Sequence, residues 1–418
     1  MESAVKIIRG GILIDGTGKD PLKNAVVVVK GKRIEDVGVE GKVRVPEGKV
    51  IDAKGKIVMP GLIDIHVHTS LSSWTPAGAM RTCLQPLALT VLEAERNLQR
   101  TLEAGYTTIK ENGAVDSVDI ALRKAIEIGM ILGPRMICCG KALTITGGHA
   151  DNYFYFPSNI PTPHSWGVVC NGVDEVRKAA REEIKAGADW IKLLHAGVAS
   201  YEPVPGSAQF TIEEMQTACD VAHRAGKKVC CHAQGIQAIK DSILAGVDTV
   251  EHGNQLDEEA AEMMVERNIP LVINLGSGYR IRHKTFEDLM KEGIPEKIAR
   301  KYRMPIFQYE TRRKSVQLAK KEGVTIVAIS DAVGENCGVV NAMELFCLVD
   351  AGLSPMEAVI AGTRTPAEVL QIDAGTIEPG KLADIIIVDG NPIENISILQ
   401  DRARIKMVMK EGEVAIRR

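Results

Sequence analysis

Residues 57–68 read IVMPGLIDIHVH, an apolar run that ends in two histidines separated by one valine. We interpret the run as a buried β-strand that is followed by turn residues. Side chains alternate along a strand, so His66 and His68 are predicted to face the same side. Two imidazoles at this spacing can bind one zinc ion, because a rigid strand holds both nitrogens in place. The alternative is a pair of solvated or core histidines, but each of those would need a polar partner.

Seven further apolar runs follow, separated by amphipathic helical stretches such as 174–186 and 212–225. The eight predicted strands are 57–68, 107–112, 135–140, 190–194, 228–233, 249–253, 271–274 and 325–332. Strands that alternate with helices indicate a parallel sheet with the helices outside. The pattern predicts an α/β fold, a (β/α)8 TIM barrel whose active site lies where the strands end and the loops begin.

The two ends of the chain differ from this middle part. Residues 6–57, 380–390 and 405–414 read as short β segments with glycine and aspartate turns. Neither end is long enough to close a hydrophobic core alone, so we expect the two ends to pair. The predicted domains are a small composite β-sandwich from residues 1–60 and 371–418, and the TIM barrel from residues 61–370.

Composition excludes several classes of protein. Of the 418 residues, 45% are hydrophobic and 25% are charged, which is typical of a globular chain and excludes general disorder. The formal net charge of -3 leaves no overall positive surface for nucleic acid. Nine cysteines without a Cys-x-x-Cys zinc motif indicate buried free thiols in a reducing compartment. Neither a membrane-spanning run nor a signal-peptide pattern is found, so we expect a cytoplasmic protein without a membrane partner.

Three more polar side chains end predicted strands. His232 and His252 are 20 residues apart, about the length of one βα unit, so they are predicted to lie on neighbouring strands. A single histidine is more often a core residue than a ligand, but two at equivalent points favour a metal site. Asp331 ends the last strand, which adjoins the first in a closed barrel, and is expected beside His66 and His68. A buried carboxylate is costly unless it is paired or metal-bound.

Lys192 is unusual because it lies among apolar neighbours in the predicted strand 190–194. A buried lysine loses its proton or finds an anion. A neutral amine can form a Schiff base with a substrate carbonyl, or take up CO2 to give a carbamate whose two oxygens bridge two metal ions. The four histidines and Asp331 favour the carbamate, since a Schiff-base site has no need of them. A lysine that extends to the barrel rim is the structural alternative.

These residues occur in motifs spread over almost the whole chain. The motifs are Pro60 to His68, Lys192, His232-Ala233, Glu251-His252-Gly253, Ser330-Asp331 and Gly380 to Asp384. In this order they resemble the amidohydrolase superfamily, and within it the prolidase-like and imidazolonepropionase-like zinc hydrolases. The resemblance implies a binuclear centre with two Zn2+ per subunit, bridged by N6-carboxylated Lys192 and a hydroxide.

By this resemblance His66, His68 and Asp331 hold one zinc ion, and His232 and His252 hold the other. Imidazolonepropionase itself lacks the bridging lysine, so Lys192 indicates the dipeptidase-like branch. The expected reaction is attack of the metal-bridging hydroxide on a scissile carbonyl, because metal coordination lowers the pKa of water from 15.7 to about 7. Asp331 is the candidate proton shuttle from this water to the leaving amine.

Four further residues are candidates for substrate binding. His149 lies in a Gly-Gly-His turn that resembles the substrate loop of the prolidase-like group, and Tyr201 lies in the loop after Lys192. Arg280 and Arg282 follow the seventh strand and could clamp a carboxylate. For His149 and the two arginines, ordinary loop or surface roles are nearly as common. The residues Lys110-Glu111 and His195 depart from the commoner family pattern.

We therefore expect a metal-dependent hydrolase that cleaves a C–N amide bond in a dipeptide, Xaa-Pro or similar, or in an N-acyl amino acid. One alternative is a cyclic-amide hydrolase or deaminase of the imidazolonepropionase-like type, which a small neutral pocket would favour. A second alternative is a catalytically inactive oligomeric scaffold, although such proteins lose ligands and this chain has all six. By the resemblance we also expect a homo-oligomer.

Overall fold

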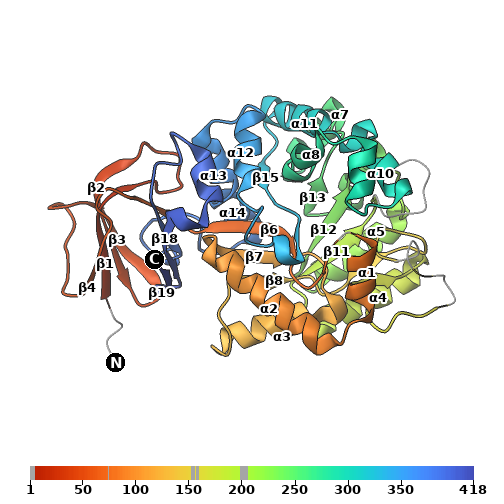
Figure 1. Cartoon of the computed structure of the whole chain (residues 1–418), viewed down its shortest axis with the longest axis horizontal. Helices are drawn as coiled ribbons and strands as arrows, with labels where there is room; N and C mark the ends of the chain where they lie inside the picture. Colours follow the sequence, from red (N-terminus) through yellow and green to blue (C-terminus); the bar gives the residue numbers. More distant parts are fainter. Residues whose placement is uncertain (1–4, 74, 152–155, 157–159, 198–205) are drawn as a thin grey trace.

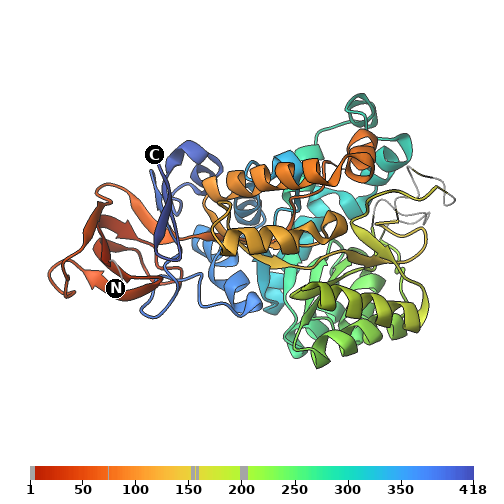
Figure 2. The same cartoon turned by 90° about the horizontal axis from the view of Figure 1, so that it is seen from below.

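The computed structural model describes residues 5–73, 75–151, 156, 160–197 and 206–418. Figure 1 shows two parts side by side: a sheet built from both chain ends, in red and dark blue, and a larger α/β part between them in sequence. Figure 2 shows the same division from below, with the C-terminus in the sheet. The sheet is called the end sheet below.

The end sheet contains eight strands. They are β1 (Val5–Leu13), β2 (Leu22–Lys30), β3 (Arg33–Val39), β4 (Lys49–Asp52), β5 (Ile57–Pro60), β17 (Ile385–Val388), β18 (Ile405–Lys410) and β19 (Glu413–Arg417). Their order is β19-β18-β17-β5-β1-β2-β3, with β4 paired to β1. The expected pairing of the chain ends is seen in β17, which runs antiparallel to β5 with Ile386 opposite Met59. The strands form one hydrogen-bonded sheet, and the two-layered sandwich stays a prediction.

The predicted first strand, 57–68, is in fact two strands in two different sheets. β5 belongs to the end sheet, and β6 (Leu62–His68) belongs to the α/β part. The chain crosses between the sheets at Gly61, whose N–H donates to the Asp384 carbonyl over 2.9 Å. A Cβ at Gly61 would clash with the side chain of Thr107. The close approach of backbone and side chain needs glycine here, and it divides the apolar run.

The α/β part has eleven strands in the described residues. They are β6 (Leu62–His68), β7 (Tyr106–Glu111), β8 (Arg135–Cys138), β9 (Ala142–Thr144), β10 (Gly167–Val169), β11 (Trp190–Leu194), β12 (Lys228–Ala233), β13 (Thr249–His252), β14 (Leu271–Ile273), β15 (Ile326–Ala328) and β16 (Ala332–Val333). All their pairings are parallel, in the orders β16-β6-β7-β8 and β10-β9-β11-β12-β13-β14-β15. β8 leads directly into β9 and β15 into β16, so the two sheets follow each other around a ring, as the predicted barrel requires.

Two more of the eight predicted strands, besides the first, are interrupted. The third, 135–140, ends at Cys138 and the chain resumes as β9, while the eighth, 325–332, is divided into β15 and β16. The second interruption contains Asp331, which has a positive φ of 52°. A left-handed residue cannot continue a strand, so the break turns this carboxylate away from the regular alternation.

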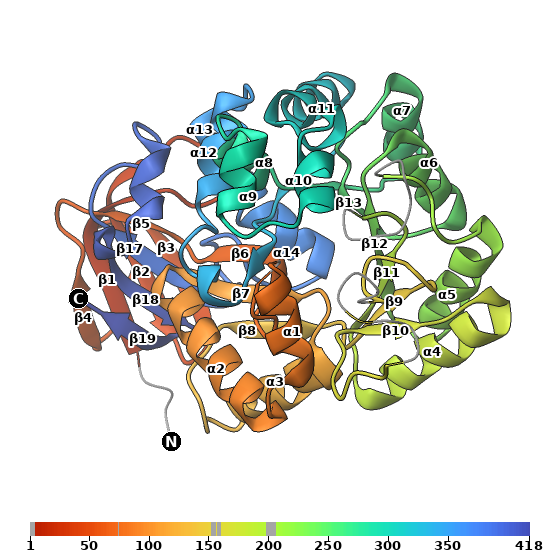
Figure 3. The ribbon, with the colours of Figure 1, turned by 45° about the vertical axis from the view of Figure 1, so that its right-hand side comes forward.

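Helices surround the ring of strands, as Figure 3 shows. They are α1 (Pro76–Leu84), α2 (Leu87–Glu103), α3 (Val118–Glu127), α4 (Gly172–Ala186), α5 (Ile212–Arg224), α6 (Ile236–Ala245), α7 (Glu258–Glu266), α8 (Gly276–Ile281), α9 (Phe286–Lys291), α10 (Glu296–Tyr302), α11 (Tyr309–Glu322), α12 (Met343–Asp350), α13 (Pro355–Ala361) and α14 (Arg364–Leu370). Over the described part of the chain, none of them is both long and apolar enough to cross a bilayer.

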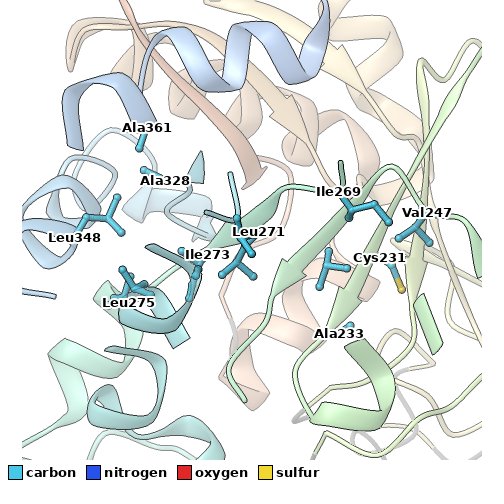
Figure 4. Packing of buried hydrophobic residues seen from close by; sticks show 14 of the residues in the cluster. Cys231, Ala233, Val247, Ile269, Leu271, Ile273, Leu275, Ala328, Leu348 and Ala361 are labelled. Atoms are coloured by element: carbon cyan, nitrogen blue, oxygen red, sulfur yellow. The ribbon is translucent and has the colours of Figure 1, made fainter. Parts of the chain in front are cut away.

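The largest hydrophobic core lies between strands and helices of the α/β part. Figure 4 shows a portion of it, in which Leu271 and Ile273 of β14 lie near Ala328, with Leu348 and Ala361 on the side of α12 and α13. All nine cysteines are buried and free, which confirms the expectation of buried thiols. This core fixes the strand ends on which the polar site residues stand.

One ion-pair network joins the barrel to the end sheet. Arg135 of β8 contacts Asp384 over 2.6 Å and Glu411 over 3.0 Å, and the Asp384 side chain is 2% exposed. Arg135→Ala is expected to lower the free energy of unfolding by about 3 kcal/mol, because it leaves a buried carboxylate without its cation. Lys32→Ala breaks an exposed pair with Glu411 and should cost less than about 1 kcal/mol. Urea unfolding measures the free energy of unfolding of both variants. Equal decreases in the two variants would contradict a larger stabilising role for the buried Arg135–Asp384 pair.

Candidate metal centre

Six predicted side chains line one cavity of about 360 Å³ at the C-terminal ends of the strands. They are His66 and His68 of β6, Lys192 of β11, His232 of β12, His252 of β13, and Asp331 between β15 and β16. The strand ends of a parallel barrel converge on one face, and the order of the strands around the ring brings these six together. All of them except Asp331 lie on strands.

His66, His68 and Asp331 form a compact group of possible ligands. The Nε2 atoms of both histidines lie 3.6 Å from Oδ1 of Asp331. Ligands bound to zinc at about 2.0–2.1 Å in a tetrahedron are roughly 3.3–3.5 Å apart, so this spacing is close to that of a metal site. The Nδ1 atom of His68 is 3.2 Å from the Gly113 carbonyl. This contact assigns the proton to Nδ1 and leaves the Nε2 lone pair directed at the group.

His232 and His252 form a second group beside the first. Their ring centroids are 4.1 Å apart, and the His252 ring is 5.0 Å from that of His66. The Nδ1 atom of His252 is 2.8 Å from Oδ1 of Asn274, so Asn274 fixes the tautomer. Among the described residues, neither Nε2 atom has a hydrogen-bond partner, although both are buried. Buried lone pairs without a donor are costly, and a divalent cation would satisfy both. The residues therefore fit a metal.

Glu251 is a functional candidate that the sequence reasoning did not identify. Its carboxylate contacts the Lys192 amine, and it accepts hydrogen bonds from Lys110 over 3.2 Å and from Asn112 over 2.7 Å. It also lies 3.1 Å from Nδ1 of His66. β7 and β13 are not neighbours in either sheet, so the contact between Lys110 and Glu251 crosses the barrel interior. One carboxylate thus lies between two fully buried lysines directly beneath the histidines.

The ionisation of these groups follows from their burial. Desolvation lowers the pKa of His68 to about 3 and lowers the pKa values of His66, His232 and His252 well below the usual range. Neutral imidazole is the form that binds a metal. Burial also lowers the pKa of Lys192 to about 8, and a neutral amine is the form that combines with CO2.

Asp331 shows the opposite direction of shift. Desolvation raises the pKa of its carboxyl to about 7, although the charges of Lys192 and Arg312 act in the other sense. A partly exposed carboxyl with a pKa near neutrality can hold or release a proton at physiological pH. It would be fully ionised beside a divalent cation.

The predicted substrate residues are placed unequally. His149 lines the cavity, with its ring 5.0 Å from that of His232, and Arg280 of α8 also lines it. Arg282 is not among the described residues that line the cavity. Its guanidinium stacks 3.3 Å from the Tyr279 ring centroid and donates to the Tyr279 carbonyl. Tyr201 lies outside the described residues.

Two further buried residues, His195 and Arg312, lie near the six candidate ligands in the barrel. His195, one of the departures from the family pattern, is buried and accepts a hydrogen bond from the Phe210 N–H over 3.1 Å, outside the cavity lining. Arg312 of α11 does line the cavity and is 5% exposed. The sequence reasoning missed Arg312, although it shares the buried face of α11 with Tyr309, Val316 and Ala319. A lone arginine at that helical spacing is a signal that could have found it.

Comparison with known proteins gives a consistent result. The Amidohydrolase family pattern matches residues 57–415 of the chain. Ochratoxinase from Aspergillus niger is 30% identical over 437 aligned residues, covering 99% of this chain and 87% of that protein. Imidazolonepropionase from Pyrobaculum arsenaticum is 26% identical, covering 94% of this chain and 92% of that protein. The crystal structure of a prolidase complexed with N-methylphosphonate-L-proline is similar with a TM-score of 0.87 at 31% identity, covering 99% of this chain and 100% of that one.

Proposed function

The chain belongs to the amidohydrolase family and is a hydrolase of carbon–nitrogen bonds, and on this premise we propose that it is a binuclear zinc enzyme. The proposed substrate is a dipeptide, Xaa-Pro or similar, or an N-acyl amino acid. Family membership confirms the resemblance seen in the motifs. The similarity to a prolidase supports the dipeptide as the first substrate to test.

One observation carries this proposal. Four buried histidines, one aspartate and one lysine converge on a single cavity, and the Nε2 atoms of His232 and His252 have no hydrogen-bond partner among the described residues. We assign His66, His68 and Asp331 to one zinc ion and His232 and His252 to the other. Lys192, in its carboxylated form, is assigned as the bridge between them.

The residues divide the chemical work as follows. Zinc bound by these residues would supply a reactive water near neutral pH and would polarise the scissile carbonyl. Asp331 takes the proton of the attacking water and delivers it to the leaving nitrogen, as a general base that becomes a general acid. His149, which lines the cavity beside His232, would donate a hydrogen bond to the substrate carbonyl.

The cationic lining of the cavity favours this function over a cyclic-amide substrate without a carboxylate. A purine-like base or a neutral ring amide suits a small neutral pocket. Arg280 and Arg312 both line the cavity instead. A cation near the reacting bond matches the free carboxylate of a dipeptide or an N-acyl amino acid.

A screen of dipeptides, N-acyl amino acids and cyclic amides with zinc-loaded protein tests the proposal. Hydrolysis of an open-chain amide is expected, with loss of at least about 99% of the rate on chelation and recovery on adding Zn2+, because the reactive water depends on the metal. Metal analysis should find two zinc ions per chain. Activity on ring compounds alone would support the first alternative, and protein without stoichiometric zinc would support the scaffold. Light scattering on the same sample measures the expected homo-oligomer.

A further inference from the structure

We infer that Arg312 binds a free carboxylate of the substrate, so that the preferred substrates are amides whose amine half is an amino acid with an unblocked carboxyl group. This inference rests on the proposed function of the cavity and names the residue that recognises the carboxylate of the amine half. It concerns a residue on a helix outside the ring of strands, which none of the family motifs in the sequence includes.

The guanidinium of Arg312 is held at one corner only. Its Nη1 donates to the Asn274 carbonyl over 3.0 Å and to Oγ of Ser277. Asn274 is also the residue that fixes the His252 tautomer. The anchored end of Arg312 is therefore attached to the chain segment that supports the candidate metal centre, and its position relative to that centre is fixed.

The other edge of the guanidinium is unused. Nε is buried and has no hydrogen-bond partner, and in the described part of the chain the only hydrogen bonds of this side chain are those of Nη1. Nε and Nη2 form the edge that binds a carboxylate with two parallel hydrogen bonds. A pair of unsatisfied donors on a cavity wall is the arrangement expected of a carboxylate site that fills when substrate binds.

Within the residues that the structure describes, no carboxylate forms an ion pair with Arg312. The carboxylates whose charges act on Arg312 are Glu344 and Asp331. Glu344 accepts hydrogen bonds from the N–H groups of Leu275 and Gly276 over 2.6 and 2.8 Å, and Asp331 faces His66 and His68. Neither forms an ion pair with Arg312 among the described residues. A buried cation without a paired anion is costly, and a bound anion would remove that cost.

The apolar residues beside Arg312 indicate which side chain the amine half of the substrate carries. Ile281, Ile298 and Phe307 line the same cavity as Arg312, so a carboxylate held by Arg312 would lie beside apolar side chains. Arg280, by contrast, is exposed at this wall. An amino acid with an apolar side chain or a pyrrolidine ring, its carboxylate directed at Arg312, fits this combination of charge and apolar surface.

The test compares acid and amide forms of the same substrates: methionyl-L-proline with methionyl-L-prolinamide, and N-acetyl-L-phenylalanine with its amide. The wild-type protein should prefer the acid in kcat/KM by about 10- to 100-fold, the range expected for a charged hydrogen bond. Arg312→Met should lose that preference mainly through KM, and Arg312→Lys, which keeps the charge without the fork, should retain part of it. Arg313→Met, the adjacent residue, which pairs with Glu310 on the surface, is the matched control and should retain the wild-type preference.

Calorimetry with L-proline and L-prolinamide gives a reading that does not depend on turnover. Wild-type protein should bind L-proline more tightly, and Arg312→Met should bind both equally. Equal rates on acid and amide by the wild type, or equal losses on both in Arg312→Met, would overturn the inference while leaving amide hydrolysis intact. If no compound is hydrolysed, the proposed function fails. Calorimetry then still tests Arg312 as a carboxylate-binding residue. Tighter binding of L-proline than of L-prolinamide that is lost in Arg312→Met supports this role, and equal binding of the two by the wild type contradicts it.

Discussion

Asp331→Asn is expected to lower kcat on the best amide substrate by about a thousand-fold or more. General acid–base catalysis contributes about 10²- to 10⁴-fold, and the amide side chain is also a poorer metal ligand than a carboxylate. Asp331 has a positive φ of 52°, a conformation that Asn tolerates as readily as Asp. The substitution therefore preserves the backbone and the side-chain shape, and the lost activity reports on the carboxylate itself.

The matched control for this substitution is Asp248→Asn at the opposite end of the barrel. Asp248 precedes β13 and accepts hydrogen bonds from the Val229 N–H over 2.8 Å and from the His223 ring over 2.9 Å. It should change kcat by less than about threefold, since it lies far from the cavity. Steady-state rates with zinc analysis of each protein separate chemistry from metal loss. An Asp331→Asn protein with near wild-type rates would remove Asp331 from the shuttle role.

One regularity of the sequence predicted that the six candidate metal ligands lie together, and Glu251 shows the limit of that regularity. Polar residues at the ends of apolar runs converge in a barrel, so six residues could be placed together from sequence. Strict alternation along β13 would put Glu251 and His252 on opposite faces. The structure instead gives His252 a positive φ of 72°, which bends the strand end so that both residues serve the interior. A backbone conformation of this kind has no signal in the residue types.

Contacts across the barrel interior, and contacts made by its outer helices, also could not be predicted from the sequence. Lys110 was noticed only as a departure from a pattern, although it meets Glu251 across the interior. Arg312 lies on the buried face of α11 with Tyr309, Val316 and Ala319, and the helical spacing does not say that the cavity lies opposite it. The contacts of Lys110 and of Arg312 depend on which side chains from distant segments meet in the fold. Hydrophobic periodicity predicts the buried face of a helix or strand, but it does not predict which residues pack against that face. The same limit explains why a single run was predicted at Gly61, where the chain changes sheets.

Lys192→Arg should reduce activity about a thousand-fold or more and lower the metal content from two ions per chain to one or none. Arginine retains the positive charge that faces Glu251, but a guanidinium does not combine with CO2 because it stays protonated. The substitution thus separates two mutually exclusive states of Lys192: an ammonium ion paired with the Glu251 carboxylate, and a carbamate that would bridge two metal ions. Arginine can adopt only the first state, so the reactive water that depends on bound metal is lost.

The measurement is metal analysis together with carbon-13 NMR of protein equilibrated with labelled bicarbonate. A carbamate signal is expected in the wild type and not in Lys192→Arg. Lys110→Arg is the control, since Lys110 also pairs with Glu251 and is equally buried, yet it does not line the cavity. It should retain the signal and both metal ions. If Lys192→Arg binds two zinc ions and turns over normally, Lys192 serves only to neutralise Glu251, and the two metal ions must be held without a bridging carbamate.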